Sequence, residues 1–259
     1  MRRVFLGSQR PALLSAVDYL WRHYGPAGEC LRAGASLGWD LSGTVMVPPG
    51  ARAGRRLNEL LAMRADSEGV PYLPPDVTTI GQLPELLYPA KRPFATRLVQ
   101  QLTWSNVLRQ ASDATLAPIL AAQPLAEEKD RWLELASVLW KQHRVLAAEG
   151  LSFDDVAQQV GAIGNTEVPR WQALSKLQQA YLDALDGYGL WDKQTARLHA
   201  LAHQECVSHQ DLLMIATVDM GRAMRQMLDQ VRDRVAVLVY ADETDASRFD
   251  AMGCVVPDD

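Results

Sequence analysis

Cysteine is scarce in the 259-residue sequence, which contains only Cys30, Cys206 and Cys254. Three widely spaced cysteines neither form a disulfide framework nor match the spacing of a zinc ribbon, so we expect reduced, buried thiols. Runs of about eighteen apolar residues, which a membrane-spanning helix requires, are also absent. The polar Ser8-Gln9-Arg10 follows the first apolar residues too soon for a signal peptide. The sequence therefore predicts a cytoplasmic protein with no membrane contact.

Positively charged residues are fewer than negatively charged ones. The sequence has 26 Lys and Arg residues and 31 Asp and Glu residues, which gives a formal net charge of −5. Phosphate binding needs accumulated Lys and Arg, so this balance argues against a domain that grips nucleic acid with its whole surface. Local basic patches remain compatible with it. Apolar residues make up 48% of the chain and charged residues 22%, which predicts a globular protein with a large core.

Apolar periodicity predicts that strands alternate with helices near both ends of the chain. The expected strands are residues 3–6, 43–47, 77–80, 212–218, 235–240 and 254–256. Helices are expected over residues 11–24, 51–67, 222–231 and 244–251, and the Gly- and Ala-rich residues 25–40 are expected to form a loop. Parallel neighbours need long connections, which are usually helices, so the alternation predicts a parallel sheet. The chain stops just after the last expected strand, and we expect it to be part of a longer protein.

The alternation ends at Gln82, and from there to about Gln204 the apolar residues follow only a helical period. We therefore predict an α/β fold whose parallel sheet is flanked by helices and interrupted by an all-helical insertion. Residues 1–90 and 206–259 are expected to form the split sheet domain, and residues 91–205 the insertion.

Tryptophans lie on the apolar stripes of the predicted insertion, among them Trp132, Trp140 and Trp171. Their rings are of the kind that stacks on nucleic-acid bases. A tryptophan on an apolar stripe is more often part of the core, and we favour that interpretation.

Ligands of open α/β sheets bind beyond the carboxyl ends of the strands, so the loops that follow the predicted strands are the candidate sites. The first loop, Gly7-Ser8-Gln9-Arg10-Pro11, lies where a phosphate-binding loop would join a strand to a helix. It lacks the second glycine and the Lys-Ser/Thr pair, which would reach the β and γ phosphates and hold magnesium. The sequence thus predicts a degenerate phosphate loop without ATP hydrolysis, and we expect no catalytic residue and no cofactor in this chain.

Asp219 follows the strand that is predicted to end at Val218, where an NTPase would place a magnesium-binding aspartate. The next residue is Met220 rather than a catalytic glutamate. One carboxylate is weak support for a metal site, and we favour Asp219 as the N-cap of the helix that begins near Gly221.

Basic residues cluster after two of the predicted strands. Arg52, Arg55 and Arg56 open the helix after the second strand, and Arg222 and Arg225 follow the fourth. For any single arginine a solvated helix face is the simpler interpretation. Helix N-termini attract phosphates, so as a group beside the strand ends these arginines indicate a path for DNA.

Two patterns that suggest metal chemistry are incomplete. His199 and His203 lie four residues apart, with a glutamate and a cysteine close behind, but alanine stands where an HExxH motif has its glutamate. The residue types of a nuclease motif occur in two separate segments, Pro75-Asp76 and Glu127-Glu128-Lys129. These segments are far apart in the sequence, and the second is expected to begin a helix. We therefore expect a plain helix end at the histidines and no metal site.

Three segments together resemble the start of an AddB- or RecB-type helicase-exonuclease subunit: Leu6-Gly7-Ser8-Gln9-Arg10, the run Val47-Pro48-Pro49-Gly50-Ala51-Arg52-Ala53-Gly54-Arg55-Arg56-Leu57, and Thr78-Thr79-Ile80-Gly81-Gln82-Leu83. The order of these segments is similar to that in the family, and residues 212–240 resemble the paired strands after its helical insertion. The resemblance implies a RecA-like (P-loop NTPase-like) sheet domain that is split by helices and has lost its ATPase motifs.

In that family the segments after the second and third strands line the path of single-stranded DNA, which implicates Arg52, Arg55, Arg56, Thr79 and Gln82. The resemblance also implies partners, namely a C-terminal PD-(D/E)XK nuclease region beyond Asp259 and a helicase subunit. We therefore predict a non-catalytic, helicase-like module of a DNA repair or recombination exonuclease. Two alternatives stay open: a nucleotide- or sugar-nucleotide-using α/β enzyme with its ligand at the same strand ends, and a structural domain whose insertion docks another subunit.

Overall fold

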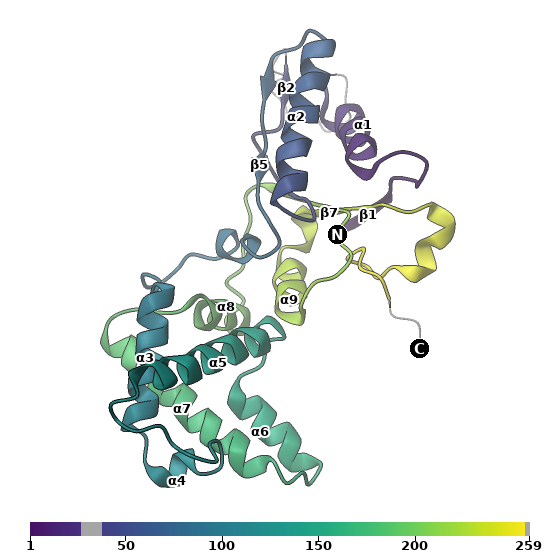
Figure 1. Cartoon of the computed structure of the whole chain (residues 1–259). Helices are drawn as coiled ribbons and strands as arrows, with labels where there is room; N and C mark the ends of the chain where they lie inside the picture. Colours follow the sequence, from purple (N-terminus) through teal and green to yellow (C-terminus); the bar gives the residue numbers. More distant parts are fainter. Residues whose placement is uncertain (27–37, 257–259) are drawn as a thin grey trace. The chain divides into compact units, whose positions relative to one another are not determined.

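The computed structural model of the chain describes residues 1–26 and 38–256 (Figure 1). The chain forms two compact units. The sheet unit comprises Met1–Tyr88, Cys206–Met220 and Met224–Asp259, and the helical unit comprises Pro89–Glu205 and Gly221–Ala223. Cys30 and most of the expected loop over residues 25–40 lie outside the described residues.

All strands belong to the sheet unit. They are β1 (Arg2–Phe5), β2 (Trp39–Asp40), β3 (Thr44–Val47), β4 (Tyr72–Leu73), β5 (Asp76–Val77), β6 (Asp211–Ile215) and β7 (Val235–Val239). Five of them form an all-parallel sheet in the order β1-β7-β6-β3-β5, and β2 pairs with β4 in a separate parallel pair. With helices on its faces, this sheet confirms the predicted α/β fold.

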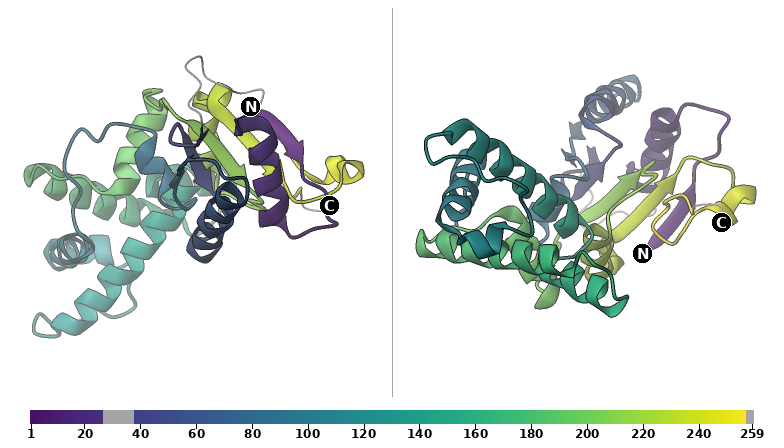
Figure 2. Two further views of the ribbon diagram at one scale, coloured as in Figure 1. Left: turned by 90° about the horizontal axis from the view of Figure 1, so that it is seen from above. Right: turned by 60° about the horizontal axis from the view of Figure 1, so that its bottom comes forward.

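Helices α1 (Ala12–Tyr24) and α2 (Ala51–Ser67) cover one face of the sheet (Figure 2). The chain crosses the sheet in the same direction from β1 to β3 and from β3 to β5, so right-handed crossovers place both helices on one face. The core on this face includes Leu20 of α1, Leu57 of α2 and Leu213 of β6. The β6–β7 connection runs the opposite way, which places α9 (Arg222–Gln230) on the other face with Met227 and Leu228 buried.

The strand ends differ from the prediction at the carboxyl edge of the sheet. The expected strand 212–218 ends at Ile215, because Ala216 adopts a left-handed conformation with φ +48°. The expected strand 77–80 contributes only Val77, because the Thr79 carbonyl accepts the N–H groups of Gln82 and Leu83 and turns the chain. That turn leads into the 3₁₀ helix η1 (Leu83–Leu86).

The predicted elements at the end of the chain are also wrong. The expected helix 244–251 is a shorter 3₁₀ helix, η3 (Glu243–Arg248), and another 3₁₀ turn, η2 (Arg232–Arg234), precedes β7. Instead of the expected strand 254–256 there is a single antiparallel bridge between Phe249 and Val255. The Asp250 carboxylate accepts the backbone N–H groups of Met252 and Cys254 at 2.8 and 3.0 Å and so holds this segment as a turn.

The helical unit contains the predicted amphipathic helices. They are α3 (Arg97–Gln110), α4 (Asp113–Leu116), α5 (Lys129–Ala148), α6 (Phe153–Ala162), α7 (Val168–Gly187) and α8 (Lys193–Ala202). Trp132 and Trp140 are buried in its core and Trp171 packs against it, as the prediction of core tryptophans requires. Among the residues that the structure describes, no helix is long and apolar enough to cross a bilayer.

Candidate nucleic-acid interface

The loops after β1, β3 and β5 lie at one edge of the sheet, because parallel strands share the direction of their carboxyl ends. The loop after β1 is the one that the sequence predicts to be a degenerate phosphate loop. Gly7 adopts φ +76° there, a conformation that favours glycine, and its N–H donates to the Ala241 carbonyl at 3.0 Å. The loop of β1 is thus tied to the loop of its neighbour β7.

An internal carboxylate occupies the donors that a phosphate would use in this loop. The Ser8 backbone N–H donates to Asp242 Oδ1 at 3.1 Å, and the Ser8 hydroxyl donates to Asp242 Oδ2 at 2.7 Å. The Tyr240 hydroxyl donates to the Ser8 carbonyl at 3.3 Å. A negative charge in this position repels the phosphates of a nucleotide.

The remaining residues of the loop add little positive charge to it. Gln9 is exposed, and Arg10 forms an ion pair with Asp18 of α1 at 2.5 Å. Beside this pair a cleft of about 330 Å³ lies between β1 and α1, and its lining includes Arg2 and Arg22. Cationic side chains therefore surround Asp18 at the free edge of the sheet.

The start of α2 carries an excess of positive charge. Its N-cap is Gly50, which offers no side-chain acceptor, and its first turn contains no acidic residue. Arg52, Arg55 and Arg56 lie three and four residues apart, so they share one helix face. The positive end of the helix dipole and these guanidinium groups reinforce each other, which favours binding of an anion.

The side chains of the three arginines differ in whether they form an ion pair within the protein. Arg56 donates to Glu59 at 2.9 Å in an exposed ion pair. Arg52 and Arg55 are exposed, and in the described ranges neither side chain makes a hydrogen bond or ion pair with another residue. Two guanidinium groups at the start of α2 are therefore available to an external anion.

The end of β5 lies beside the start of α2. Met46 of β3 is in register with Val77 of β5, and Gly54 packs so closely on Val77 that an added Cβ would lie 2.9 Å from Val77 Cγ1. The turn after β5 contains Thr79, whose hydroxyl donates to the Gln82 side-chain oxygen at 3.4 Å. The structure thus brings the predicted residues of the second and third loops to adjacent strand ends.

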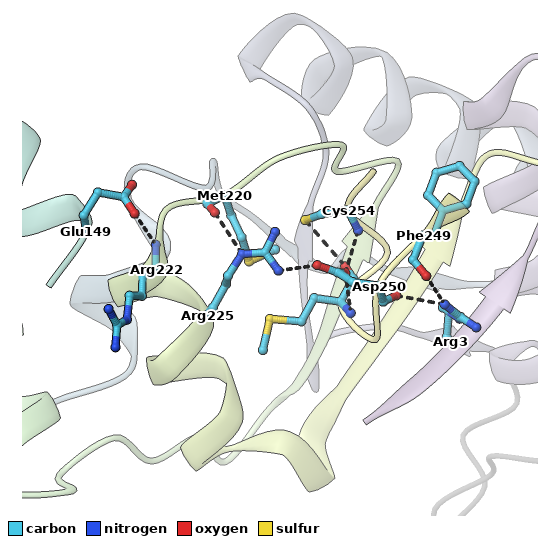
Figure 3. Close-up of polar contacts among 9 residues, drawn as sticks. Arg3, Glu149, Met220, Arg222, Arg225, Phe249, Asp250 and Cys254 are labelled. Carbon is cyan, nitrogen blue, oxygen red and sulfur yellow. Dashed lines mark hydrogen bonds and ion pairs between the residues drawn. The ribbon is translucent and has the colours of Figure 1, made fainter. Parts of the chain in front are cut away.

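Arg222 belongs to the helical unit, whereas the other residues predicted to bind DNA belong to the sheet unit. Its backbone N–H donates to Glu149 Oε2 at 3.3 Å, while its guanidinium points away from that carboxylate (Figure 3). Asp219 lies three residues before the first residue of α9, so the prediction that it is the N-cap is wrong, and Glu149 accepts the first N–H of the helix instead.

Arg225 has a structural role that the sequence pattern did not reveal. Its Nε donates to the Met220 carbonyl at 3.0 Å, and its guanidinium pairs with Asp250 (Figure 3). Burial alone would raise the pKa of Asp250, but hydrogen bonds from Arg225 and from the backbone of Cys254 and Met252 outweigh burial and lower it. Arg225 is thus committed to holding the last turn of the chain.

The same turn is fastened to β1 and encloses a thiol. Arg3 of β1 donates to the Phe249 carbonyl at 2.6 Å and to the Asp250 carbonyl at 2.9 Å. Cys254 is buried, and burial raises the pKa of its thiol to about 11, so it stays protonated at neutral pH. Cys206 is also buried and forms no disulfide, as predicted for both.

No protein-family model matches the sequence, and no curated protein matches it. The assignment of a function therefore depends on the chemistry of the sheet edge. That edge pairs the Ser8 hydroxyl with a carboxylate, Asp242, in the loop after β1. It offers exposed cationic and hydrogen-bonding side chains after β3 and β5.

Proposed function

We propose that the chain is a non-catalytic, helicase-like module of a DNA repair or recombination exonuclease of the AddB type, with a RecA-like sheet domain. In this proposal the module binds single-stranded DNA at the carboxyl edge of its sheet. The observation that carries this proposal is the uncapped start of α2 with the unpaired Arg52 and Arg55. DNA phosphates would neutralise this charge, and Thr79 and Gln82 offer polar contacts beside it. Strand cleavage and ATP hydrolysis would be carried by a PD-(D/E)XK nuclease region and a helicase subunit.

The loop after β1 supports a role without nucleotide turnover. Its Ser8 donors are satisfied by Asp242, and the lysine that would reach the β and γ phosphates is absent from the sequence of the loop. The nucleic-acid site and the degenerate phosphate loop are therefore separate parts of the same sheet edge.

The test is the binding of a fluorescently labelled single strand to the whole chain over a series of salt concentrations. Arg52→Ala and Arg55→Ala are each expected to weaken binding and to reduce the slope of log K against log salt by about 0.7, the value for one phosphate contact on a single strand. Arg56→Ala is expected to have a smaller effect, because Glu59 already pairs with Arg56.

Arg232→Ala is the matched control. Arg232 is an exposed arginine in η2, which precedes β7 and so lies at the amino edge of the sheet, opposite the proposed site. The substitution removes the same charge, and we expect the salt slope to stay unchanged. Equal slopes for the wild type and the Arg52 and Arg55 variants would refute the proposed site.

The alternative is a nucleotide- or sugar-nucleotide-using enzyme, and the arginine-lined cleft between β1 and α1 is the observation that favours it. Its volume lies near the lower end of the range for small-molecule sites, about 300–1,000 Å³. This hypothesis predicts that nucleotides or sugar nucleotides with magnesium raise the melting temperature. Our proposal predicts no such rise, so a thermal-shift screen separates the two.

A further inference from the structure

Two histidines and a glutamate converge at the end of the helical unit. His199 lies in the last turn of α8 and His203 is its C-cap, and their rings stack with centroids 4.0 Å apart. One possible ligand atom each from His199, His203 and Glu205 lies within 4.8 Å of the others. Helical spacing of four residues places the two imidazoles on one face, which is the arrangement that a shared metal ion needs.

Hydrogen bonds determine which nitrogen of each ring carries a lone pair. His203 Nδ1 lies 2.9 Å from the His199 carbonyl oxygen, which only accepts, so the proton is on Nδ1 and the lone pair on Nε2. His199 Nε2 lies 3.0 Å from the Lys91 ammonium, which only donates, so this nitrogen also carries a lone pair. Both rings are therefore in a tautomer that coordinates through Nε2.

The backbone places Glu205 against the histidines by an unusual turn. Gln204 adopts φ +53°, a left-handed conformation that a residue with a Cβ rarely takes. The Glu205 N–H donates to the Ala200 carbonyl at 2.9 Å, and the Gln204 N–H donates to the Leu201 carbonyl at 3.2 Å. These two bonds form a Schellman motif, which reverses the chain and returns the Glu205 carboxylate to the histidine face.

A cation already occupies this cluster, because the Lys91 ammonium contacts both His199 and Glu205. The cluster thus brings two imidazole nitrogens and a carboxylate together, which is a donor set that binds metal.

Lys91 is an easily displaced occupant. Nearly half of its side chain is exposed (47%), so the ammonium can swing into water. Ion pairs with this exposure contribute little net free energy. Two histidines and a glutamate form the three-ligand set of many zinc sites, and their softness favours zinc, nickel or copper ions over magnesium.

We propose that His199, His203 and Glu205 form a surface site for one divalent transition-metal ion, which displaces the Lys91 ammonium. Water fills the remaining coordination positions of such an open site. The ion would fasten the last residues of the helical unit to one another, immediately before the chain continues into the sheet unit at Cys206.

The experiment is calorimetric titration of the metal-free whole chain with Zn²⁺, repeated with Mg²⁺. We expect one Zn²⁺ per chain and no heat from Mg²⁺. His199→Gln and His203→Gln should each abolish the heat of Zn²⁺ binding. Lys91→Gln should bind Zn²⁺ about two- to fivefold more tightly, because it removes a competing exposed ion pair.

His209→Gln is the matched control, because His209 belongs to the sheet unit and lies outside the cluster. Circular dichroism of each variant checks that the helices are intact, and the visible spectrum of bound Co²⁺ reports imidazole and carboxylate coordination directly. Zn²⁺ affinity in His199→Gln or His203→Gln equal to that of the wild type would overturn the proposal. Binding to Lys91→Gln that is no tighter than to the wild type would overturn the displacement of Lys91.

Discussion

Asp192 accepts three hydrogen bonds in the interior of the helical unit, and its replacement tests how this unit is held together. The carboxylate is fully buried and accepts from the Thr195 N–H at 2.6 Å, from His143 Nε2 at 3.0 Å and from the Tyr181 hydroxyl at 2.9 Å. Asp192→Ala leaves these three donors without an acceptor. Because each buried donor left without an acceptor costs about 1–3 kcal/mol, we expect a loss of about 3–5 kcal/mol in the free energy of unfolding.

The hydrogen bonds of the His143 ring determine which of its nitrogens carries the proton. The Gln178 side-chain oxygen accepts the Phe153 N–H at 3.0 Å, so its amide nitrogen is the group that lies 2.8 Å from His143 Nδ1 and donates to it. His143 Nδ1 is therefore an acceptor, and the ring proton is on Nε2, directed at Asp192. In the part of the chain that the structure describes, this proton makes its hydrogen bond to Asp192 alone, so we expect the full cost of leaving it unsatisfied.

The assay is urea denaturation followed by tryptophan fluorescence, to which Trp104 contributes from a stacked contact with Tyr181 at 4.2 Å between centroids. Thr96→Ala is the control, because Thr96 caps α3 through the Val99 N–H at an exposed site and its loss should cost about 1 kcal/mol. If Asp192→Ala were no more destabilising than Thr96→Ala, the network would contribute nothing beyond an N-cap, and the reasoning would be refuted.

The same network predicts the direction of the pH dependence. Burial alone would raise the pKa of Asp192, but hydrogen bonds from His143 and Thr195 outweigh it, and the pKa in the folded state is lowered. A lowered pKa stabilises the fold above the unfolded value of about 3.9, and this contribution is lost as the pH falls through the pKa of the folded state. Asp192→Ala should therefore flatten the acid side of the stability curve.

Two further substitutions test the sheet unit. Gly253→Ala should cost about 2–4 kcal/mol of stability in urea denaturation, because φ is +71° and the new Cβ would lie 2.5 Å from Val237 Cγ1. The control is Gly69→Ala, which has a similar φ of +64° but open space around it and should cost about 1–2 kcal/mol. Equal costs would contradict the close packing of the turn on β7. Asp242→Ala should lower stability by about 1 kcal/mol, because it removes the acceptor of both Ser8 donors. The variant should still show no ATP hydrolysis in a phosphate-release assay, because the substitution does not supply the missing lysine. Turnover above background would contradict the assignment of a degenerate loop.

The strands that sequence reasoning found are those with a strong apolar signal. β6 and β7 are buried on both faces, so nearly every residue is apolar and the run stands out. β2 and β4 contain two residues each and therefore show no periodicity. The β-branched Val255 and Val256 suggested a strand, but the hydrogen bonds of the Asp250 carboxylate override this local preference.

The candidate site was predictable only where its residues are neighbours in the sequence. Arg52 and Arg55 stand at a helix start that the local pattern marks, and their position follows from it. Asp242 lies 234 residues from Ser8, and their contact arises because β7, the second-last element of the chain, inserts beside β1. In the same way Lys91 lies 108 residues from His199, so no spacing rule relates them.

The order of the strands determines how far the proposed DNA path lies from the loop after β1. β1 and β3 are separated by β7 and β6, which is a distance of about 14 Å across three strand spacings. The Asp242 carboxylate acts on the loop of β1, and at that separation solvent and salt screen it from Arg52 and Arg55 beside β3 and β5. A substitution that changes the charge at the loop after β1 should therefore not affect the proposed DNA path, so the two sites can be altered independently. This independence predicts that Asp242→Ala leaves the salt slope of DNA binding unchanged while Arg55→Ala reduces it.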